Sequence, residues 1–255
     1  MNLKSKKFYS DNITIGSWIS LYNLGMTEIF AKNNFDWIVV DLEHSHITIN
    51  QAAELIRIID LCGSRPLIRL TSNNQDQIKR VLDAGAHGII VPMVNNINDA
   101  VRAVNYTKYM PDGLRGVGLA RAQEYGNGFE KYLEWQKNEI LVIAQIEHID
   151  GVQNLDEIIS VNGIDGIFVG PYDLSSSLGK PGDFSSRQYL DSLKKIKYLI
   201  NSKKIIAGIH IVEPDIEKVS DAIKDGFNFV SYSVDFRIID STIKDAIQSI
   251  KKKIN

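Results

Sequence analysis

Eight short apolar stretches alternate along the chain with longer amphipathic segments, and this alternation restricts the fold more than any other feature. The stretches lie at 14–18, 37–41, 66–70, 88–92, 141–146, 166–169, 205–210 and 229–233, and most of them are nearly continuous runs rich in Ile and Val. Such runs are typical of strands that are buried on both faces of a parallel sheet. The segments between them have the length and periodicity of helices, at 49–61, 74–84, 98–108, 151–160, 186–201 and 215–225, with a terminal helix at 238–253.

Eight strand–helix units predict an α/β fold, a single (β/α)8 TIM barrel that spans residues 1–255. The competing layout is an open, doubly wound sheet, which usually carries a Gly-rich turn after its first strand. The residues from Gly16 onward, Gly-Ser-Trp-Ile-Ser, do not form such a turn. Helix boundaries agree with the barrel: Thr48 and Gln51 have capping-box spacing, and Gly85 and Gly226 each follow a predicted helix.

One connection, between the fourth and fifth predicted strands, is much longer than the others. It contains Tyr125, Phe129, Tyr132 and Trp135, whose spacing is compatible with a helix that buries one face. Long connections in compact domains are commonly lids or interfaces. Two interpretations are therefore open: the segment packs against its own barrel, or it serves as a lid or a subunit contact.

Composition excludes several classes of protein. The 29 basic and 31 acidic residues give a net charge of −2, which does not indicate a partner such as nucleic acid or an anionic membrane. The single cysteine, Cys62, cannot form an internal disulfide. No apolar run approaches the ~20 residues that span a bilayer. Residues 1–8 lack the apolar region of a secretory signal. We expect a cytoplasmic protein with no membrane partner.

Polar side chains follow several of the predicted strands, and in a (β/α)8 barrel all these positions meet at the rim that carries active sites. Glu147 and Asp173 follow the fifth and sixth strands, and two carboxylates with water commonly hold Mg²⁺ or Mn²⁺. Arg69 ends the third strand, where a buried guanidinium needs an anion from the protein or the substrate. His44 follows the second strand and is a candidate base.

Each of these residues also has a structural interpretation when it is taken alone. Glu147 and Asp173 could be helix caps or surface charges, and His44 could be a structural histidine. Their convergence on one rim favours an active site. Trp18 ends the first strand at that rim, and we expect it to contact the substrate.

Missing motifs narrow the chemistry. The sequence contains neither a P-loop nor a Gly-x-Ser-x-Gly nucleophile elbow. No lysine ends a predicted strand, where a Schiff-base aldolase would need one. A barrel of this kind that makes or breaks carbon–carbon bonds is expected to use a metal.

The chain contains several short motifs whose order and spacing resemble those of the HpcH/HpaI family of metal-dependent, class II pyruvate aldolases, over about residues 16–240. The motifs that carry the resemblance are Phe35-Asp-Trp-Ile-Val-Val-Asp-Leu-Glu-His44, Pro66-Leu-Ile-Arg69, Val81-Leu-Asp-Ala-Gly-Ala-His-Gly-Ile-Ile-Val-Pro-Met-Val94, Leu114-Arg-Gly-Val-Gly118, Gln145-Ile-Glu147, Gly170-Pro-Tyr-Asp-Leu-Ser175 and Leu178-Gly-Lys-Pro-Gly182.

The resemblance implies a role for individual residues. Glu147 and Asp173 correspond to ligands of a divalent metal ion, Mg²⁺, Mn²⁺ or Co²⁺. Arg69 corresponds to the arginine that binds pyruvate and stabilises its enolate. His44 corresponds to the catalytic base, and Asp83 to the acid that makes this base more basic. The role of Asp83 rests on the resemblance alone, because the sequence places it at the end of a helix.

Further contacts with the substrate follow from the same resemblance. Asp41 is expected to help orient His44, and Gln145 to contact the substrate. The backbone at Tyr172 and Asp173 is expected to meet the pyruvate carboxylate. Tyr172 stands where family members often have a small residue, so the shape of the pocket is expected to differ here.

The implied reaction is the reversible retro-aldol cleavage of a 4-hydroxy-2-oxo acid to pyruvate and an aldehyde, by a homo-oligomer such as a hexamer. Two alternatives are open: a related CoA-ester lyase of the citramalyl- or malyl-CoA type, and a non-catalytic barrel. The Asp-x-Glu-His motif at 41–44 favours the aldolase. A non-catalytic barrel is expected to have lost a metal ligand or the catalytic base, and here all of these residues are present. The sequence does not identify the aldehyde.

Overall fold

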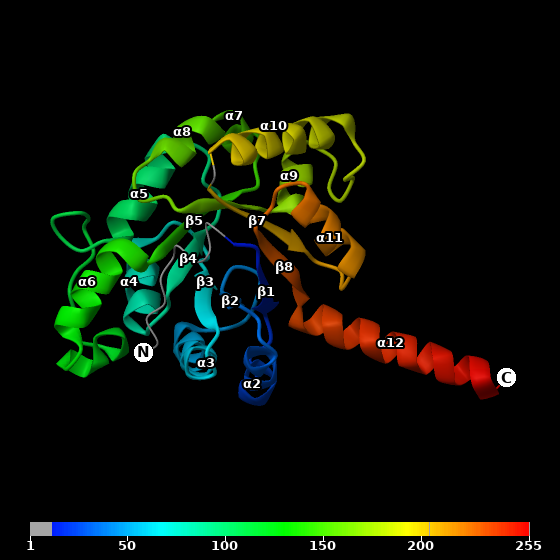
Figure 1. Cartoon of the computed structure of the whole chain (residues 1–255), viewed down its shortest axis with the longest axis horizontal. Helices are drawn as coiled ribbons and strands as arrows, with labels where there is room; N and C mark the ends of the chain where they lie inside the picture. Colours follow the sequence, from blue (N-terminus) through cyan, green and yellow to red (C-terminus); the bar gives the residue numbers. More distant parts are fainter. Residues whose placement is uncertain (1–11, 204, 255) are drawn as a thin grey trace.

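The computed structural model describes residues 12–203 and 205–254, so residues 1–8, which concern the predicted absence of a secretory signal, lie outside the described residues. Eight parallel strands form a closed barrel in chain order, as predicted (Figure 1). The strands are β1 (Thr14–Ile19), β2 (Trp37–Asp41), β3 (Arg65–Arg69), β4 (Gly88–Val91), β5 (Leu141–Ile146), β6 (Gly166–Val169), β7 (Ile206–Ile211) and β8 (Phe229–Val234). The predicted runs match these strands to within one residue at either end.

Helices cover the outside of the barrel between successive strands (Figure 1). They are α2 (Leu24–Lys32), α3 (Ile49–Leu61), α4 (Gln75–Asp83), α5 (Ile97–Thr107), α6 (Phe129–Glu139), α7 (Ile149–Gln153), α8 (Leu155–Ser160), α9 (Pro171–Ser177), α10 (Arg187–Lys203), α11 (Ile216–Lys224) and α12 (Asp235–Ile254), with the 3₁₀ helix η1 (Arg121–Gly126). The predicted helix at 151–160 is instead α7 and α8, which meet at Asn154, where the backbone leaves helical geometry. The capping box of Thr48 and Gln51 is confirmed.

Large side chains fill the inside of the barrel. Trp18, Trp37, Phe168 and Phe229 are almost wholly buried there, and the rings of Trp37 and Phe229 stack with centroids 3.9 Å apart. Because the interior is packed, a substrate can enter only at a rim, where the connecting loops diverge. Within the described residues, no helix is long and apolar enough to cross a bilayer.

The long segment between β4 and β5 packs against its own barrel. Tyr132 and Trp135 of α6 are buried, and the ring of Trp135 lies 5.1 Å from that of His87. The buried guanidinium of Arg115 lies over Tyr109 and donates to the hydroxyl of Tyr132 at 3.0 Å. The first of the two interpretations therefore holds for α6. A separate apolar surface of this segment stays exposed, formed by Leu114, Val117, Leu119 and Tyr125.

The C-terminal helix α12 is longer than predicted, since it already begins at Asp235. It projects away from the barrel, as Figure 1 shows in orange and red. Of its twenty residues, all in the described range, only Asp235 is buried. The carboxylate of Asp235 accepts hydrogen bonds from the backbone N–H groups of Ser20 and Leu21, at 3.0 and 2.8 Å, which attach the start of the helix to the end of β1.

Candidate active site

A cavity of about 410 Å³ opens at the C-terminal ends of the strands. Seven of the residues predicted for the site line it, namely Trp18, Asp41, His44, Arg69, Gln145, Tyr172 and Asp173. They come from four strands, the β2–α3 loop and the first turn of α9, so closure of the barrel is what brings them together. Glu147 is buried next to Gln145, and Asp83 is at the other end of the barrel.

Arg69 and Asp41 form the central ion pair of the site. Nε and Nη2 of Arg69 donate to the two carboxylate oxygens of Asp41 at 2.9 and 2.7 Å. The two residues are direct neighbours in the β2–β3 register, which fixes this two-point geometry. The guanidinium also lies 4.7 Å from the centre of the Trp18 ring. Burial opposes ionisation of Asp41, but its hydrogen bonds and attraction to Arg69 prevail and hold its pKa below the ordinary value.

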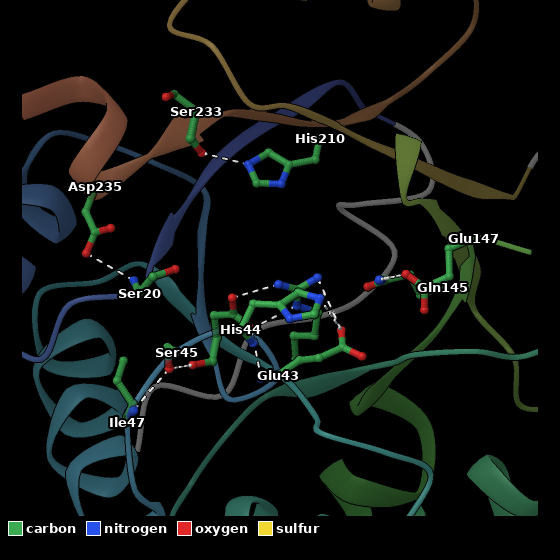
Figure 2. Close-up of polar contacts among 12 residues, drawn as sticks. Ser20, Glu43, His44, Ser45, Ile47, Gln145, Glu147, His210, Ser233 and Asp235 are labelled. Carbon is green, nitrogen blue, oxygen red and sulfur yellow. Dashed lines mark hydrogen bonds and ion pairs between the residues drawn. The ribbon is translucent and has the colours of Figure 1, made fainter. Parts of the chain in front are cut away.

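Asp41 positions His44 through the backbone. Its Oδ1 accepts from the N–H groups of Glu43 and His44, at 3.0 and 3.3 Å. The imidazole itself is exposed, and its Nε2 lies 4.0 Å from a carboxylate oxygen of Glu43 (Figure 2). Asp41 therefore orders the loop that carries His44 through its backbone, whereas the carboxylate that contacts the imidazole ring is that of Glu43.

Glu147 is held below the cavity. Its Oε1 accepts from the N–H of Met93 at 2.7 Å, and its Oε2 accepts from the side-chain amide of Gln145 (Figure 2). A Cβ on Gly170 would lie 2.9 Å from Oε2, so only glycine lets the β6–α9 connection come this close. Burial raises the pKa of Glu147, and its proximity to Asp173 adds to this effect.

Glu43 belongs to the site although the sequence did not single it out. One of its carboxylate oxygens lies 3.3 Å from Nη1 of Arg69. Burial, with repulsion from Glu147, Asp41 and Asp173, raises the pKa of Glu43 to about 7 against the attraction of Arg69. Its place between Asp41 and His44 in the chain was a signal, but its side chain had no predicted partner.

Asp83 is not brought to this site within one chain. It ends α4 at the N-terminal rim of the barrel, where its carboxylate accepts from Nη2 of Arg115 at 2.6 Å. Its side chain is 20% exposed, and the partly exposed backbone of the β4–β5 segment passes beside it at Gly118. The predicted contact between Asp83 and His44 is thus absent from the described residues of a single chain.

Tyr172 and Asp173 lie in the first turn of α9, at the cavity wall. The first N–H groups of a helix lack intrahelical acceptors, and α9 begins with Pro171, which has no N–H. The N–H of Gly170 already donates to Ile146, at 3.2 Å. The free backbone donors of this turn are therefore those of Tyr172 and Asp173, where a carboxylate is favoured.

His210 forms an uncharged part of the wall. Its ring stacks on that of Trp18, with centroids 4.8 Å apart, and its Nε2 lies 3.1 Å from the carbonyl oxygen of Ser233 (Figure 2). A carbonyl only accepts, so Nε2 carries the proton. Burial lowers the pKa of His210 to about 4, and the imidazole is neutral at physiological pH.

The donor set fits a hard divalent cation. Glu43, Glu147 and Asp173 repel one another around one guanidinium, and this excess of negative charge is what a cation would relieve. Among the described residues no three acidic, His or Cys side chains are arranged as a ready metal site. Glu147 and Asp173 would therefore leave several coordination positions to water or substrate oxygen, as Mg²⁺ sites commonly do.

Comparison with known proteins agrees with this geometry. The sequence model of the HpcH/HpaI aldolase/citrate lyase family matches residues 14–240. This chain belongs to that family. The 2-keto-3-deoxy-L-rhamnonate aldolase of Escherichia coli O6:K15:H31 is 33% identical over 245 residues, which are 95% of this chain and 91% of the relative. The enzyme of the same name from Klebsiella pneumoniae is 37% identical over 223 residues, 87% and 82% of the two chains.

Solved structures of family members have the same fold. The HpcH/HpaI aldolase/citrate lyase family protein of Burkholderia cenocepacia superposes with a TM-score of 0.90 at 28% identity, covering 96% of this chain and 98% of that one. The citrate synthase SbnG superposes with a TM-score of 0.84 at 28% identity, covering 95% and 94%. The chain is thus an aldolase, a carbon–carbon lyase of a metal-dependent class, and the non-catalytic interpretation is set aside.

Proposed function

We propose that this aldolase cleaves a 4-hydroxy-2-oxo acid reversibly into pyruvate and an aldehyde, using residues in and next to the cavity at the C-terminal rim of the barrel. One observation carries the proposal: a single guanidinium, Arg69, lies between an ion-paired carboxylate and three further carboxylates at the mouth of the barrel. The names of the relatives support a sugar-derived 2-keto-3-deoxy acid as the class of substrate.

Glu147 and Asp173 would hold the divalent ion, Mg²⁺, Mn²⁺ or Co²⁺. Such an ion, when bound, acts as a Lewis acid and stabilises negative charge on the oxygens of the 2-oxo acid. The amide of Gln145 fixes one oxygen of Glu147, and the N–H of Met93 fixes the other. These bonds hold the carboxylate in one orientation before any ligand arrives, which is the purpose of second-layer contacts at a metal site.

The pyruvate half of the substrate would lie between Arg69 and the first turn of α9. The backbone donors of Tyr172 and Asp173 bind its carboxylate, while Arg69 supplies a fixed positive charge close to the oxygen where negative charge develops. Asp41 holds the guanidinium rigid at two points. The Trp18 ring covers the guanidinium and limits access of water to it.

His44 would remove the proton from the 4-hydroxyl group as the carbon–carbon bond breaks. Its exposed ring lies at the open side of the cavity, where the aldehyde half must leave. Asp83 was predicted to make this base stronger, but in its own chain it lies at the opposite rim. Asp83 of a neighbouring copy would have to supply that contact, and the role therefore requires an oligomer.

Two surfaces support a homo-oligomer. The projecting helix α12 exposes a stripe of large apolar side chains, Phe236, Ile239, Ile243, Ile247, Ile250 and Ile254. Apolar groups at this spacing lie on one face of a helix and are normally covered. Helices α11 and α2 also leave apolar side chains exposed. Ala222 is the one buried residue of α11, all of which is described, and Ile216 of α11 and Ile29 of α2 are 73% and 63% exposed. A second copy of the chain could cover both surfaces.

Pyruvate release tests the proposal directly. The purified enzyme, supplied with Mg²⁺ or Mn²⁺, is offered a panel of 4-hydroxy-2-oxo acids, and pyruvate is measured with lactate dehydrogenase and NADH. We expect release that a chelator abolishes and the added ion restores. Activity that resists the chelator would reject the metal role of Glu147 and Asp173. Cleavage of citramalyl-CoA or malyl-CoA in place of the hydroxy acids would assign the enzyme to the CoA-ester lyases.

A further inference from the structure

The direction of the substrate across the cavity follows from the positions of the groups that would bind its two ends. The pyruvate carboxylate would lie at the first turn of α9, which follows β6, whereas the base for the 4-hydroxyl group, His44, follows β2. In a closed barrel of eight strands in chain order, β2 is opposite β6. The carbon chain beyond the 4-hydroxyl carbon therefore continues past His44, away from Tyr172 and α9.

The cavity wall on this side of His44 is formed by the ends of β1 and β8. Ser20, directly after β1, and Val234, the last residue of β8, both line the cavity. Among the described residues that line it, none comes from β4, so the space next to His44 opens toward β1 and β8. Figure 2 shows Ser20 and Glu147 on opposite sides of His44, as this order of strands requires.

The hydroxyl group of Ser20 is available to a ligand. Ser20 is half-buried, and its Oγ makes no hydrogen bond within the described part of the chain. Its backbone is nevertheless fixed, because its N–H donates to the buried carboxylate of Asp235 at 3.0 Å. Two serines close to it in the barrel differ in this respect: the hydroxyls of Ser17 and Ser233 donate to backbone carbonyls at 2.9 and 2.8 Å.

The groups around Ser20 offer few other partners for a hydroxyl group of the substrate. Val212, after β7, and Val234, at the end of β8, line the cavity and have apolar side chains. The charged neighbours Asp41 and Arg69 bond each other at two points. A substrate hydroxyl that enters this part of the cavity loses hydrogen bonds to water, which Ser20 is placed to replace.

We propose that the hydroxyl of Ser20 binds the hydroxyl group on carbon 5 of the substrate, next to the carbon that carries the 4-hydroxyl group. This inference rests on the proposed aldol reaction and deepens it. In the aldehyde product the same group is the 2-hydroxyl, so Ser20 selects 2-hydroxyaldehydes. Sugar-derived 2-keto-3-deoxy acids carry a hydroxyl group at this carbon. Ser20 takes no part in proton transfer here, and its effect is on specificity.

The test compares two aldehydes in the synthetic direction, each with pyruvate and Mg²⁺: glycolaldehyde, and propionaldehyde, which has a methyl group in place of the 2-hydroxyl. Ser20→Ala should lower the glycolaldehyde-to-propionaldehyde ratio of kcat/KM about 3–10-fold, the effect of one hydrogen bond between neutral groups. The kcat/KM for propionaldehyde should stay near its wild-type value. Differences in hydration and intrinsic reactivity cancel, because the ratio is compared between variants.

Ser72→Ala is the matched control. This exposed serine follows β3 at the same rim and does not line the cavity, so the ratio should not change. A ratio that Ser20→Ala leaves unchanged would overturn the inference and leave the aldolase proposal in place. An equal fall in kcat/KM for both aldehydes would also overturn it, because Ser20 would then support the site as a whole. If wild type added pyruvate to neither aldehyde, the proposed function would fail together with the inference.

Discussion

The two rims of the barrel treat buried charge in opposite ways. At the N-terminal rim the buried cations have acceptors: Arg115 bonds Asp83 and Tyr132, and Arg65 donates to two backbone carbonyls, those of His87 and Glu139. At the C-terminal rim one cation, Arg69, lies among four carboxylates, Asp41, Glu43, Glu147 and Asp173. The first rim is electrostatically balanced, and the second carries an excess of negative charge.

This difference separates stability from function. In a balanced network each charge offsets part of the desolvation penalty of its partner, and removal of one partner leaves the other buried and uncompensated. An unbalanced cluster is expensive, and the raised pKa values of Glu43 and Glu147 are the sign of that cost. Clusters of this kind are retained where a ligand or cation supplies the missing charge. Changes at the upper, C-terminal rim should therefore affect catalysis, and changes at the lower, N-terminal rim should affect folding, apart from Asp83, whose proposed role is in the site of a neighbouring copy.

The largest effect is expected from Arg69→Ala. The variant removes the guanidinium at the centre of the upper cluster, and kcat/KM for aldol cleavage should fall about 10²–10³-fold, as it does when one charge-stabilising donor is lost. Initial rates of pyruvate release measure the loss. Circular dichroism should still report a folded barrel. Near-wild-type turnover would reject the role of Arg69, and with it the assignment of catalysis to the charge cluster at the C-terminal rim.

Asp60→Asn is the corresponding change at the lower rim. Asp60 is buried between Nε2 of His87, 3.6 Å away, and the guanidinium of Arg121. Breaking a buried pair costs about 3 kcal/mol or more, which for a chain of this size lowers Tm by roughly 10 °C. Thermal unfolding measures this shift, and kcat of the folded enzyme should change little. The exposed pair partner Asp76 provides the control, since Asp76→Asn should leave Tm near that of wild type.

The fold was predictable because its signal is repeated eight times. Most of the buried strands are almost continuous apolar runs rich in Ile and Val, so that one misplaced end does not alter the topology. The helix α2 was missed for the opposite reason: it buries only Thr27, Phe30 and Ala31 and has a weak apolar pattern. The break between α7 and α8 at Asn154 depends on a single backbone conformation, which periodicity does not encode.

For the candidate site, the strand ends predicted at which rim each residue lies but not which side chains pair with one another. Arg69 and Asp41 were expected at one rim, but their two-point pairing follows from the β2–β3 register, which is a property of the closed sheet. A carboxylate oxygen of Glu43 lies 3.3 Å from the Arg69 guanidinium, yet in the sequence, next to His44, Glu43 resembles an ordinary surface acid. The resemblance gave Asp83 a role at the site, whereas the sequence pattern put it at the end of a helix, and the structure confirms the second placement, at the far rim.

The position of Asp83 leads to a third prediction, which links the two rims. His44→Ala and Asp83→Asn should each reduce activity strongly. If a site takes His44 from one copy and Asp83 from its neighbour, mixed oligomers regain intact sites. Random reassembly of equal amounts would restore about a quarter of wild-type activity by this symmetry argument. Pyruvate release after mixing under exchange conditions is the measurement. Separate oligomers, mixed without exchange, should remain inactive and serve as the control; no recovery after exchange would confine the active site to one chain.

The smallest effect is a pH dependence of stability that belongs to the upper rim. Glu43 has a pKa of about 7 in the folded enzyme, above its unfolded value of about 4.3. The folded state therefore holds a proton that the unfolded chain has released, and this contribution to stability is present below about pH 4 and lost as the pH rises to 7. By linkage the loss is at most about 4 kcal/mol, and solvent screening of this half-buried carboxylate makes it smaller.

Urea unfolding of the metal-free enzyme between pH 5 and 8 would measure this slope as the difference between wild type and Glu43→Gln, because His210, with its pKa lowered to about 4, acts in the opposite sense below about pH 6.5, as Asp41 does at lower pH. The stability of wild type should fall more steeply with pH than that of Glu43→Gln. Saturating Mg²⁺ should flatten the wild-type slope, because a nearby cation favours the ionised carboxylate. Asp60→Asn, at the balanced rim, should lower the whole curve and keep its slope. If Glu43→Gln retained the wild-type slope, the proton would be held elsewhere, and the contrast between the rims would rest on Glu147 instead.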